Sequence, residues 1–250
     1  MMNLSKTIAV RPNKKIYRDG SCVIKLMNED YSASDVLNEA FNMSVVYETG
    51  FAVPALYEAL KIDGKWALVM EYIEGKTLAE LIKENPENTE AYFNRMVDIH
   101  LNMHEYKAHR LWHHIDKMQE KISQSGLDAT TRYELHTRLS GLPKHNKLCH
   151  GDFVPDNIII TPNDKAYVID WSHATQGNAS ADAARTYLRF MLAGNDKHAE
   201  VYLRLFCEKS DTARQYVEKW MAIVAASQLV KNNPAEREFL TRWAHVVEYD

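Results

Sequence analysis

The stretch of the sequence with the clearest chemical potential carries two carboxylates and an amide at fixed spacing. His150, Asp152 and Asn157 form a His-x-Asp-x4-Asn pattern, and Asp170 follows thirteen residues after Asn157. In phosphoryl transfer, one carboxylate takes the proton of the acceptor hydroxyl or amine, while a second carboxylate and an amide oxygen can hold Mg²⁺ through hard oxygen ligands. The pattern therefore predicts a site for transfer of a phosphoryl group.

The elements around this pattern must bring its two ends together. Two short β-prone segments, 158–160 and 166–169, bracket turn residues at 162–164 and predict a hairpin. Such a hairpin returns the chain to its starting point, so we expect Asp170 to face Asn157 across a metal ion.

The rest of the sequence divides into a β-rich beginning and a helical remainder. Apolar spacing predicts a helix over 34–47, and Asp63-Gly64 is a strong signal for a hairpin turn. Thr77 and Glu80 form a capping box, after which helical patterns dominate.

We therefore expect an α+β fold of two lobes, joined by a hinge near residues 71–75. The small β-rich N-lobe would span residues 1–74, and the larger helical C-lobe, with the catalytic loop, would span residues 75–250. With 250 residues, 46% of them hydrophobic, the chain is long enough to bury a substantial core.

An ordered set of motifs resembles the aminoglycoside phosphotransferase and choline kinase-like family of small-molecule kinases, which share the protein-kinase-like fold. The set consists of a strand lysine in Val23-Ile24-Lys25-Leu26, a helix glutamate at Glu39, a hinge at Glu71–Gly75, the loop His150-Gly151-Asp152, and Ile169-Asp170-Trp171. It covers nearly the whole chain in order. The resemblance implies a bilobal protein-kinase-like fold and phosphoryl transfer from ATP or GTP, with Mg²⁺, to a small molecule.

In the C-lobe, the resemblance implies a role for each matching residue. Asp152 would be the catalytic base, and Asn157 and Asp170 would bind Mg²⁺. His150 would pack beneath the catalytic loop, and Asp182 would brace that loop.

In the N-lobe, Lys25 would bind the nucleotide phosphates and Glu39 would orient it, with Glu29 and Glu48 as rival partners. The backbone of the hinge, at Glu71 and Ile73, would take the adenine. The sequence departs from a kinase pattern because it lacks Gly-x-Gly-x-x-Gly, so the phosphate-covering turn would be 13–21.

The missing glycine-rich loop motivates an alternative, a catalytically silent nucleotide-binding or scaffold protein. Protein kinase activity is disfavoured because Gly151 replaces the arginine of His-Arg-Asp and no Ala-Pro-Glu follows Asp170. His100 and His104, four residues apart on an expected helix, have a spacing that can bind zinc, but one helix supplies only two ligands.

Composition excludes several classes of partner. Thirty basic and 34 acidic residues give a net charge of −4, whereas nucleic-acid-binding domains are usually basic. No apolar stretch is long enough to cross a membrane, and three widely spaced cysteines are typical of free thiols. We expect a cytoplasmic monomer or homodimer.

The identity of the acceptor stays open at this stage. A polycationic aminoglycoside would favour a pocket rich in carboxylates, yet the last 45 residues hold seven acidic and six basic groups. A choline-type acceptor would favour an aromatic cage. The aromatic residues available for a cage are Trp171, Trp220, Trp243 and Tyr249.

Overall fold

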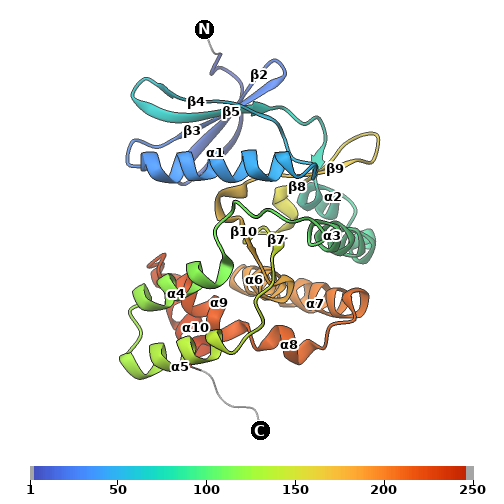
Figure 1. Ribbon diagram of the computed structural model, residues 1–250. Helices are drawn as coiled ribbons and strands as arrows, with labels where there is room; N and C mark the ends of the chain where they lie inside the picture. Colours follow the sequence, from blue (N-terminus) through green and yellow to red (C-terminus); the bar gives the residue numbers. More distant parts are fainter. Residues whose placement is uncertain (1–2, 246–250) are drawn as a thin grey trace. The chain divides into compact units, whose positions relative to one another are not determined.

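The protein is described by a computed structural model that places residues 3–245 (Figure 1). The chain forms two compact units. The first holds the residues up to Glu84 together with Pro155–His173, and the second holds Asn85–Val154 and the residues from Ala174 onward.

The first unit is built on a five-stranded antiparallel sheet. Its strands, in spatial order, are β1 (Thr7–Arg11), β2 (Lys14–Asp19), β3 (Cys22–Met27), β5 (Lys65–Glu71) and β4 (Leu56–Ile62). Asp63 and Gly64, with φ of 49° and 82°, make the turn between β4 and β5. This left-handed conformation at both positions suits a two-residue hairpin, as the sequence predicts.

Helix α1 (Ala33–Glu48) lies along one face of this sheet (Figure 1). It begins at Ser32, whose hydroxyl oxygen accepts a hydrogen bond from the Asp35 N–H at 3.0 Å. Apolar side chains of the helix pack against the sheet and fix the helix to it. The buried members of this core are Met27, Val36, Ala40 and Leu68.

A second, three-stranded sheet completes the first unit. In spatial order it consists of β6 (Lys76–Thr77), β8 (Ile158–Ile160) and β9 (Ala166–Val168). The expected capping box starts α2 (Leu78–Glu84): the Glu80 N–H donates to Thr77 Oγ1 at 3.1 Å, and the Thr77 N–H donates to Glu80 Oε2 at 2.7 Å. Short 3₁₀ turns flank the hairpin, η2 (Pro155–Asn157) and η3 (Trp171–His173).

Two sets of backbone hydrogen bonds join the β8–β9 hairpin to the N-terminal part of the chain. Strand β6 pairs with β8, and the Val168 N–H donates to the Ala52 carbonyl oxygen at 3.1 Å. As a result, residues 75–84 and 155–173 belong to the same compact unit as the five-stranded sheet.

The second unit is mainly helical. All nine residues of helix α9 are buried and seven of them are apolar, which is typical of a central helix. Around it pack α4, α6 and α10. The elements of this unit are η1 (Pro86–Asn88), α3 (Thr89–Met103), α4 (His114–Gln124), α5 (Ala129–Ser140), β7 (Lys147–Cys149), β10 (Thr175–Gly177), α6 (Ala179–Leu192), α7 (Asp196–Ser210), α8 (Arg214–Glu218), α9 (Met221–Leu229) and α10 (Pro234–Ala244).

The predicted α+β class is confirmed, with a small antiparallel sheet and one helix at the N-terminus and a largely helical remainder. Within residues 3–245, no helix combines the length and the apolar character needed to cross a membrane.

Candidate active site

A pocket of about 670 Å³ lies in the first unit, and six of the nine residues singled out from the sequence line it. The other three, His150, Asp152 and Asp182, belong to the second unit. The six residues that line the pocket are Lys25, Glu39, Glu71, Ile73, Asn157 and Asp170.

Lys25 lies on β3, the central strand of the five-stranded sheet, and is 4% exposed. Its ammonium group pairs with the Glu39 carboxylate of α1, and its Nζ donates to Asp170 Oδ1 at 3.0 Å. Burial opposes the charge of Lys25, but Glu39 and Asp170 outweigh it and hold the lysine pKa above its usual value. Of the rival glutamates, Glu29 pairs instead with Lys65, at 3.2 Å.

Asp170 accepts a second ammonium group. Lys14 Nζ of β2 donates to Asp170 Oδ2 at 2.8 Å, so two cations share one carboxylate. Burial favours the protonated acid, but Lys25 and Lys14 hold the pKa of Asp170 well below its usual range. Asp170 also has a φ of 68°, a left-handed conformation in which Asp and Asn are enriched among non-glycine residues.

Lys14 is a pocket residue that reasoning from sequence missed. Lys14 and Ile16, two residues apart on β2, both line the pocket. Side chains two residues apart on a strand lie on the same face of the sheet. The alternating pattern of β2 could therefore have indicated that Lys14 faces the same side as Ile16. Burial and the charge of Lys25 lower the pKa of Lys14, and Asp170 opposes this shift.

The β8–β9 hairpin places Asn157 and Asp170 at the same end. Ile158 pairs with Val168, and the Ile169 N–H donates to the Asn157 carbonyl oxygen at 2.9 Å. Asn157 is 8% exposed and lines the pocket. A carboxylate and an amide oxygen at one wall fit the oxygen ligands that Mg²⁺ takes.

Residues 71–75, which the sequence predicts to be the hinge, contribute to another wall of the pocket. The Tyr72 N–H donates to the Ser21 carbonyl oxygen at 2.8 Å, whereas the Ile73 N–H makes no hydrogen bond to the described part of the chain. Gly75 follows, and a Cβ at that position would lie 2.4 Å from the Ile160 carbonyl oxygen. The close approach of two backbone segments therefore requires glycine there.

In the second unit, Asp182 of α6 holds the loop that carries Asp152. Its carboxylate accepts hydrogen bonds from the backbone N–H groups of His150 (2.8 Å) and Gly151 (2.7 Å). Gly151 has a φ of 78°, a conformation that glycine adopts without steric cost. The backbone of the loop is thus fixed by one buried side chain.

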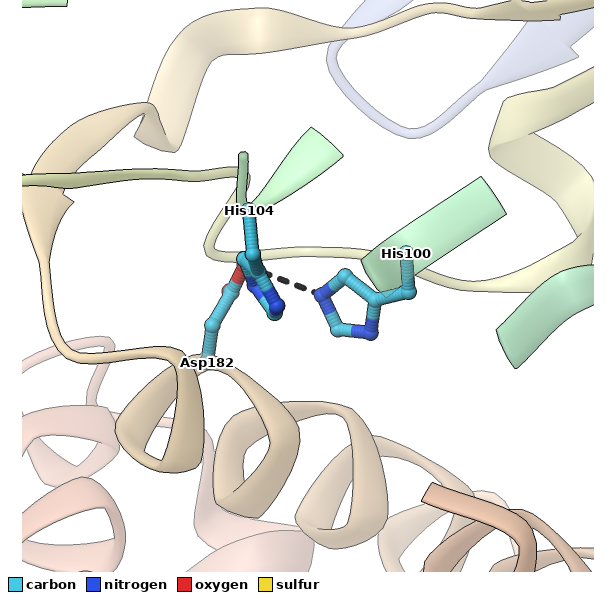
Figure 2. A group of neighbouring side chains, drawn as sticks. All are labelled: His100, His104 and Asp182. Atoms are coloured by element: carbon cyan, nitrogen blue, oxygen red, sulfur yellow. Dashed lines mark hydrogen bonds and ion pairs between the residues drawn. The ribbon is translucent and has the colours of Figure 1, made fainter. Parts of the chain in front are cut away.

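Two buried histidines complete the surroundings of Asp182 (Figure 2): His100 lies on α3, and His104 is the residue that caps its C-terminus. His100 Nε2 and His104 Nε2 lie 3.1 Å and 3.3 Å from Asp182 Oδ2, and His100 Nδ1 lies 2.7 Å from the Tyr202 hydroxyl. With both rings protonated at Nε2, each ring donates to Asp182, and His100 Nδ1 accepts from the Tyr202 hydroxyl.

His100, His104 and Asp182 offer three ligand atoms within 4.8 Å of one another, and the same atoms form this hydrogen-bond network. Burial and the neighbouring His104 lower the pKa of His100 to about 4. Burial alone would raise the pKa of Asp182, but the hydrogen bonds from both histidines hold it well below its usual range. The network therefore joins a carboxylate to the neutral ring of His100.

Asp152 lies on the braced loop. Its N–H donates to His150 Nδ1 at 3.1 Å, and its Oδ1 lies 2.8 Å from Arg189 Nε of α6. Reasoning from sequence missed Arg189, although Asp182, Arg185 and Arg189 are spaced three and four apart and share one helical face.

Among the described residues, the aromatic candidates for a choline cage do not contact one another. Trp171 and Trp220 are 1% and 0% exposed, so both are core residues. Trp243 packs on Phe239 with ring centroids 5.1 Å apart, and Tyr249 lies outside the described residues.

Known proteins share this architecture. Choline kinase LicA from Streptococcus pneumoniae superposes with a TM-score of 0.63 at 16% identity, over 96% of this chain and 93% of that one. A thermostable mutant of aminoglycoside phosphotransferase APH(4)-Ia, in a ternary complex with ADP and hygromycin B, gives 0.67 at 14% identity, over 95% and 89%. These likenesses establish the kinase-like fold.

Sequence comparison gives the family. The protein LicA homolog of Mycoplasma capricolum subsp. capricolum (strain California kid) is 26% identical over 172 residues, which cover 68% of this chain and 69% of the relative. The family model described as "Phosphotransferase enzyme family" matches residues 13–218. The chain therefore belongs to the phosphotransferase enzyme family.

Proposed function

We propose that the protein is an ATP- and Mg²⁺-dependent kinase that phosphorylates a hydroxyl or amine of a small molecule. The observation that carries this proposal is the pocket in which Lys25 joins Glu39 to Asp170, with Asn157 at the same end of the hairpin. A lysine held by a helix glutamate beside a metal-binding aspartate is the arrangement that protein kinases use for phosphoryl transfer.

The pocket residues have distinct parts in this proposal. The N–H of Ile73 binds the adenine at the hinge, and the ammonium groups of Lys14 and Lys25 bind phosphate oxygens. Asp170 and Asn157 hold Mg²⁺, which when bound neutralises the charge of the phosphates. In kinases with a glycine-rich loop, backbone N–H groups of that loop contact the phosphates. In this protein, the ammonium group of Lys14 makes the corresponding contact.

Asp152 is the base in this proposal. Its carboxylate orients the acceptor and takes the proton of the hydroxyl, while the paired Arg189 fixes the side chain. Asp182 accepts hydrogen bonds from the backbone N–H groups of His150 and Gly151, so the position of the base depends on a residue that does not touch the substrate.

The test measures ADP release from Mg-ATP with choline, ethanolamine, an aminoglycoside, homoserine, thiamine and sugars as acceptors. Loss of a general base lowers turnover by about a thousandfold. Asp152→Asn should show this loss with ATP affinity unchanged by calorimetry. Asp196→Asn, at an exposed carboxylate of the same unit, is the matched control and should match the unmodified protein.

Two results would overturn the proposal. Retained turnover in Asp152→Asn would remove the base from the mechanism. Tight Mg-ATP binding without turnover of any acceptor would favour the silent nucleotide-binding alternative.

A further inference from the structure

A group of basic side chains lies around Arg185, which donates a hydrogen bond to the loop of Asp152, and we call this group the basic cluster. Helix α4 contributes one pair of lysines and α6 one pair of arginines, each pair four residues apart and so on one face of its helix. Both helices pack on α9, and one further lysine follows the end of α9. The members are Lys117, Lys121, Arg185, Arg189 and Lys231.

Arg185 is the central member of the basic cluster. It is 6% exposed, and its one hydrogen bond within the described chain runs from Nε to the Gly151 carbonyl oxygen, at 3.2 Å. No described carboxylate lies within 4.0 Å of its guanidinium. A buried cation without an ion pair costs stability, so its retention indicates a use.

Three other cations of the same unit are paired. Each of three on α7 and α8 has a nitrogen 2.7 Å from a carboxylate oxygen. By contrast, Lys121, Arg185 and Lys231 have no ion pair within the described residues. The three paired cations are Arg204, Lys209 and Arg214.

The charges of the basic cluster act on one another. Burial and the charge of Arg185 lower the pKa of Lys121 to about 7 and that of Lys117 to about 8. Lys231 lies close enough to Arg185 and Asp152 for both charges to act on it.

Carboxylates oppose this repulsion only in part. Those that act on the basic cluster are Glu120, Asp152, Asp182 and Glu236. Asp182 is already occupied by its four hydrogen bonds, and Glu236 Oε2 accepts from Gln228 Nε2 at 2.9 Å. Positive charge is therefore in excess beside the loop.

We propose that the phosphoryl acceptor is an anion, carrying a phosphate or carboxylate group besides the hydroxyl that is phosphorylated, and that Lys121, Arg185 and Lys231 bind this group. The inference rests on the proposed function, because it assigns the acceptor to the surroundings of Asp152. A choline or polyamine acceptor would instead be repelled by the same side chains.

The reaction balances with such an acceptor. The acceptor hydroxyl gives its proton to Asp152 and its oxygen forms a bond to the γ-phosphorus of ATP. The bond from that phosphorus to the β–γ bridging oxygen breaks, and ADP leaves with the electron pair. The anionic group takes no part in the chemistry and sets the position of the hydroxyl.

Binding decides the proposal without knowledge of the natural acceptor. With Mg-ADP saturating the nucleotide pocket, inorganic phosphate and, separately, glycerate are titrated while the Tm is recorded. At least one should raise the Tm, and the double variant Lys121→Gln, Lys231→Gln should bind it at least about tenfold more weakly. The double variant Lys144→Gln, Lys219→Gln, at exposed lysines of the same unit, is the matched control.

Turnover gives a second, independent readout. Glucose is compared with glucose 6-phosphate and glycerol with glycerol 3-phosphate, alongside choline and an aminoglycoside. The anionic member of a pair should have the higher kcat/KM, and the Lys121, Lys231 double variant should lose that advantage.

The two proposals fail in different ways. An equal Tm response in all three proteins, no response to either anion, or a preference for choline or the aminoglycoside would overturn the anionic acceptor. Absence of Mg-ATP binding, with the response to phosphate intact, would instead overturn the kinase function and leave the anion site standing.

Discussion

Two carboxylates, Asp170 in the first unit and Asp182 in the second, have pKa values well below the usual range, but their surroundings differ. Asp170 is part-buried and accepts from two ammonium groups, at 2.8 Å and 3.0 Å. Asp182 is buried and accepts from two imidazole rings and two backbone N–H groups. The donors of Asp170 are side-chain cations that can yield to another cation, whereas those of Asp182 belong to the fold itself.

This difference separates a carboxylate that can act as a ligand from one that acts as a scaffold. An ammonium group on a long side chain can move when a metal ion or phosphate arrives, because its position is not set by secondary structure. Backbone N–H groups cannot move without a change in the loop. We therefore expect substitution of Asp182 to cost stability first and substitution of Asp170 to cost binding first.

The largest effect should follow Asp182→Asn. Removing the charge leaves four buried donors facing an amide, and such losses cost about 3 kcal/mol or more in the free energy of unfolding. Urea denaturation followed by tryptophan fluorescence measures this quantity. Asp196→Asn should change it by less than about 0.5 kcal/mol, as exposed positions do. A loss below about 1 kcal/mol for Asp182→Asn would remove the contrast with Asp170.

Asp170→Asn should show the opposite balance. Asn tolerates the left-handed backbone at this position, so the fold should persist with a loss of about 1 kcal/mol. The Mg²⁺-dependent part of ATP affinity should fall by about a hundredfold or more, because even supporting residues of metal sites cost 10- to 100-fold. Calorimetry of ATP binding with Mg²⁺ and with EDTA separates the two parts. Equal affinities before and after substitution, with Mg²⁺ present, would contradict the ligand role.

A pH titration sharpens the same comparison. His100 and His114 both have their pKa lowered to about 4, chiefly by burial, from an ordinary value near 6.5. The unfolded chain therefore binds more protons than the folded chain between these values, and stability is lost as pH falls through that window. Each group contributes up to about 1.4 kcal/mol per pH unit.

The variant that tests this titration is His114→Gln, which should remove one of the two contributions and so reduce the slope of the urea midpoint between pH 6.5 and 4, with the contribution of His100 retained. The two aspartates act in a lower window, since their folded pKa values are depressed and their stabilisation is lost only as pH falls below about 3.9. A flat midpoint from pH 7 to 4.5 would contradict the neutral, buried histidines.

The smallest effect should follow Lys14→Gln. One of two cations on Asp170 is lost, so stability should change by less than about 1 kcal/mol. The KM for ATP should rise by about tenfold, the scale of one charge-assisted hydrogen bond. Lys15→Gln is the matched control, because Lys15 is exposed and alternates to the other face of β2. Equal KM values in the two variants would take Lys14 out of the phosphate site.

The sequence predicts correctly those elements that are specified by a few neighbouring residues. The Asp63-Gly64 turn and the Thr77–Glu80 capping box each depend on a few neighbouring residues, and both are present. The strands β6 and β10 have two and three residues, too short for an alternating pattern to show. Their positions follow from tertiary contacts.

The candidate site divides in the same way. The motifs around Lys25 and Asp170 could be found because each lies in a short distinctive segment. The partners of Asp182 could not, because His100 and His104 lie about eighty residues earlier in the chain and meet it only through helix packing. The four-residue spacing of these histidines can be read from the sequence, but it does not distinguish hydrogen bonding to a carboxylate from binding of zinc.

The contact between Gly75 and the Ile160 carbonyl oxygen has a consequence for sequence divergence. Any side chain at position 75 would push residues 71–75 away from the small sheet. Substitutions at this position should therefore be selected against, although glycine has no side chain that could take part in the reaction. Across distant homologues, the hinge should keep a glycine at this place while the residues that read the acceptor vary around it.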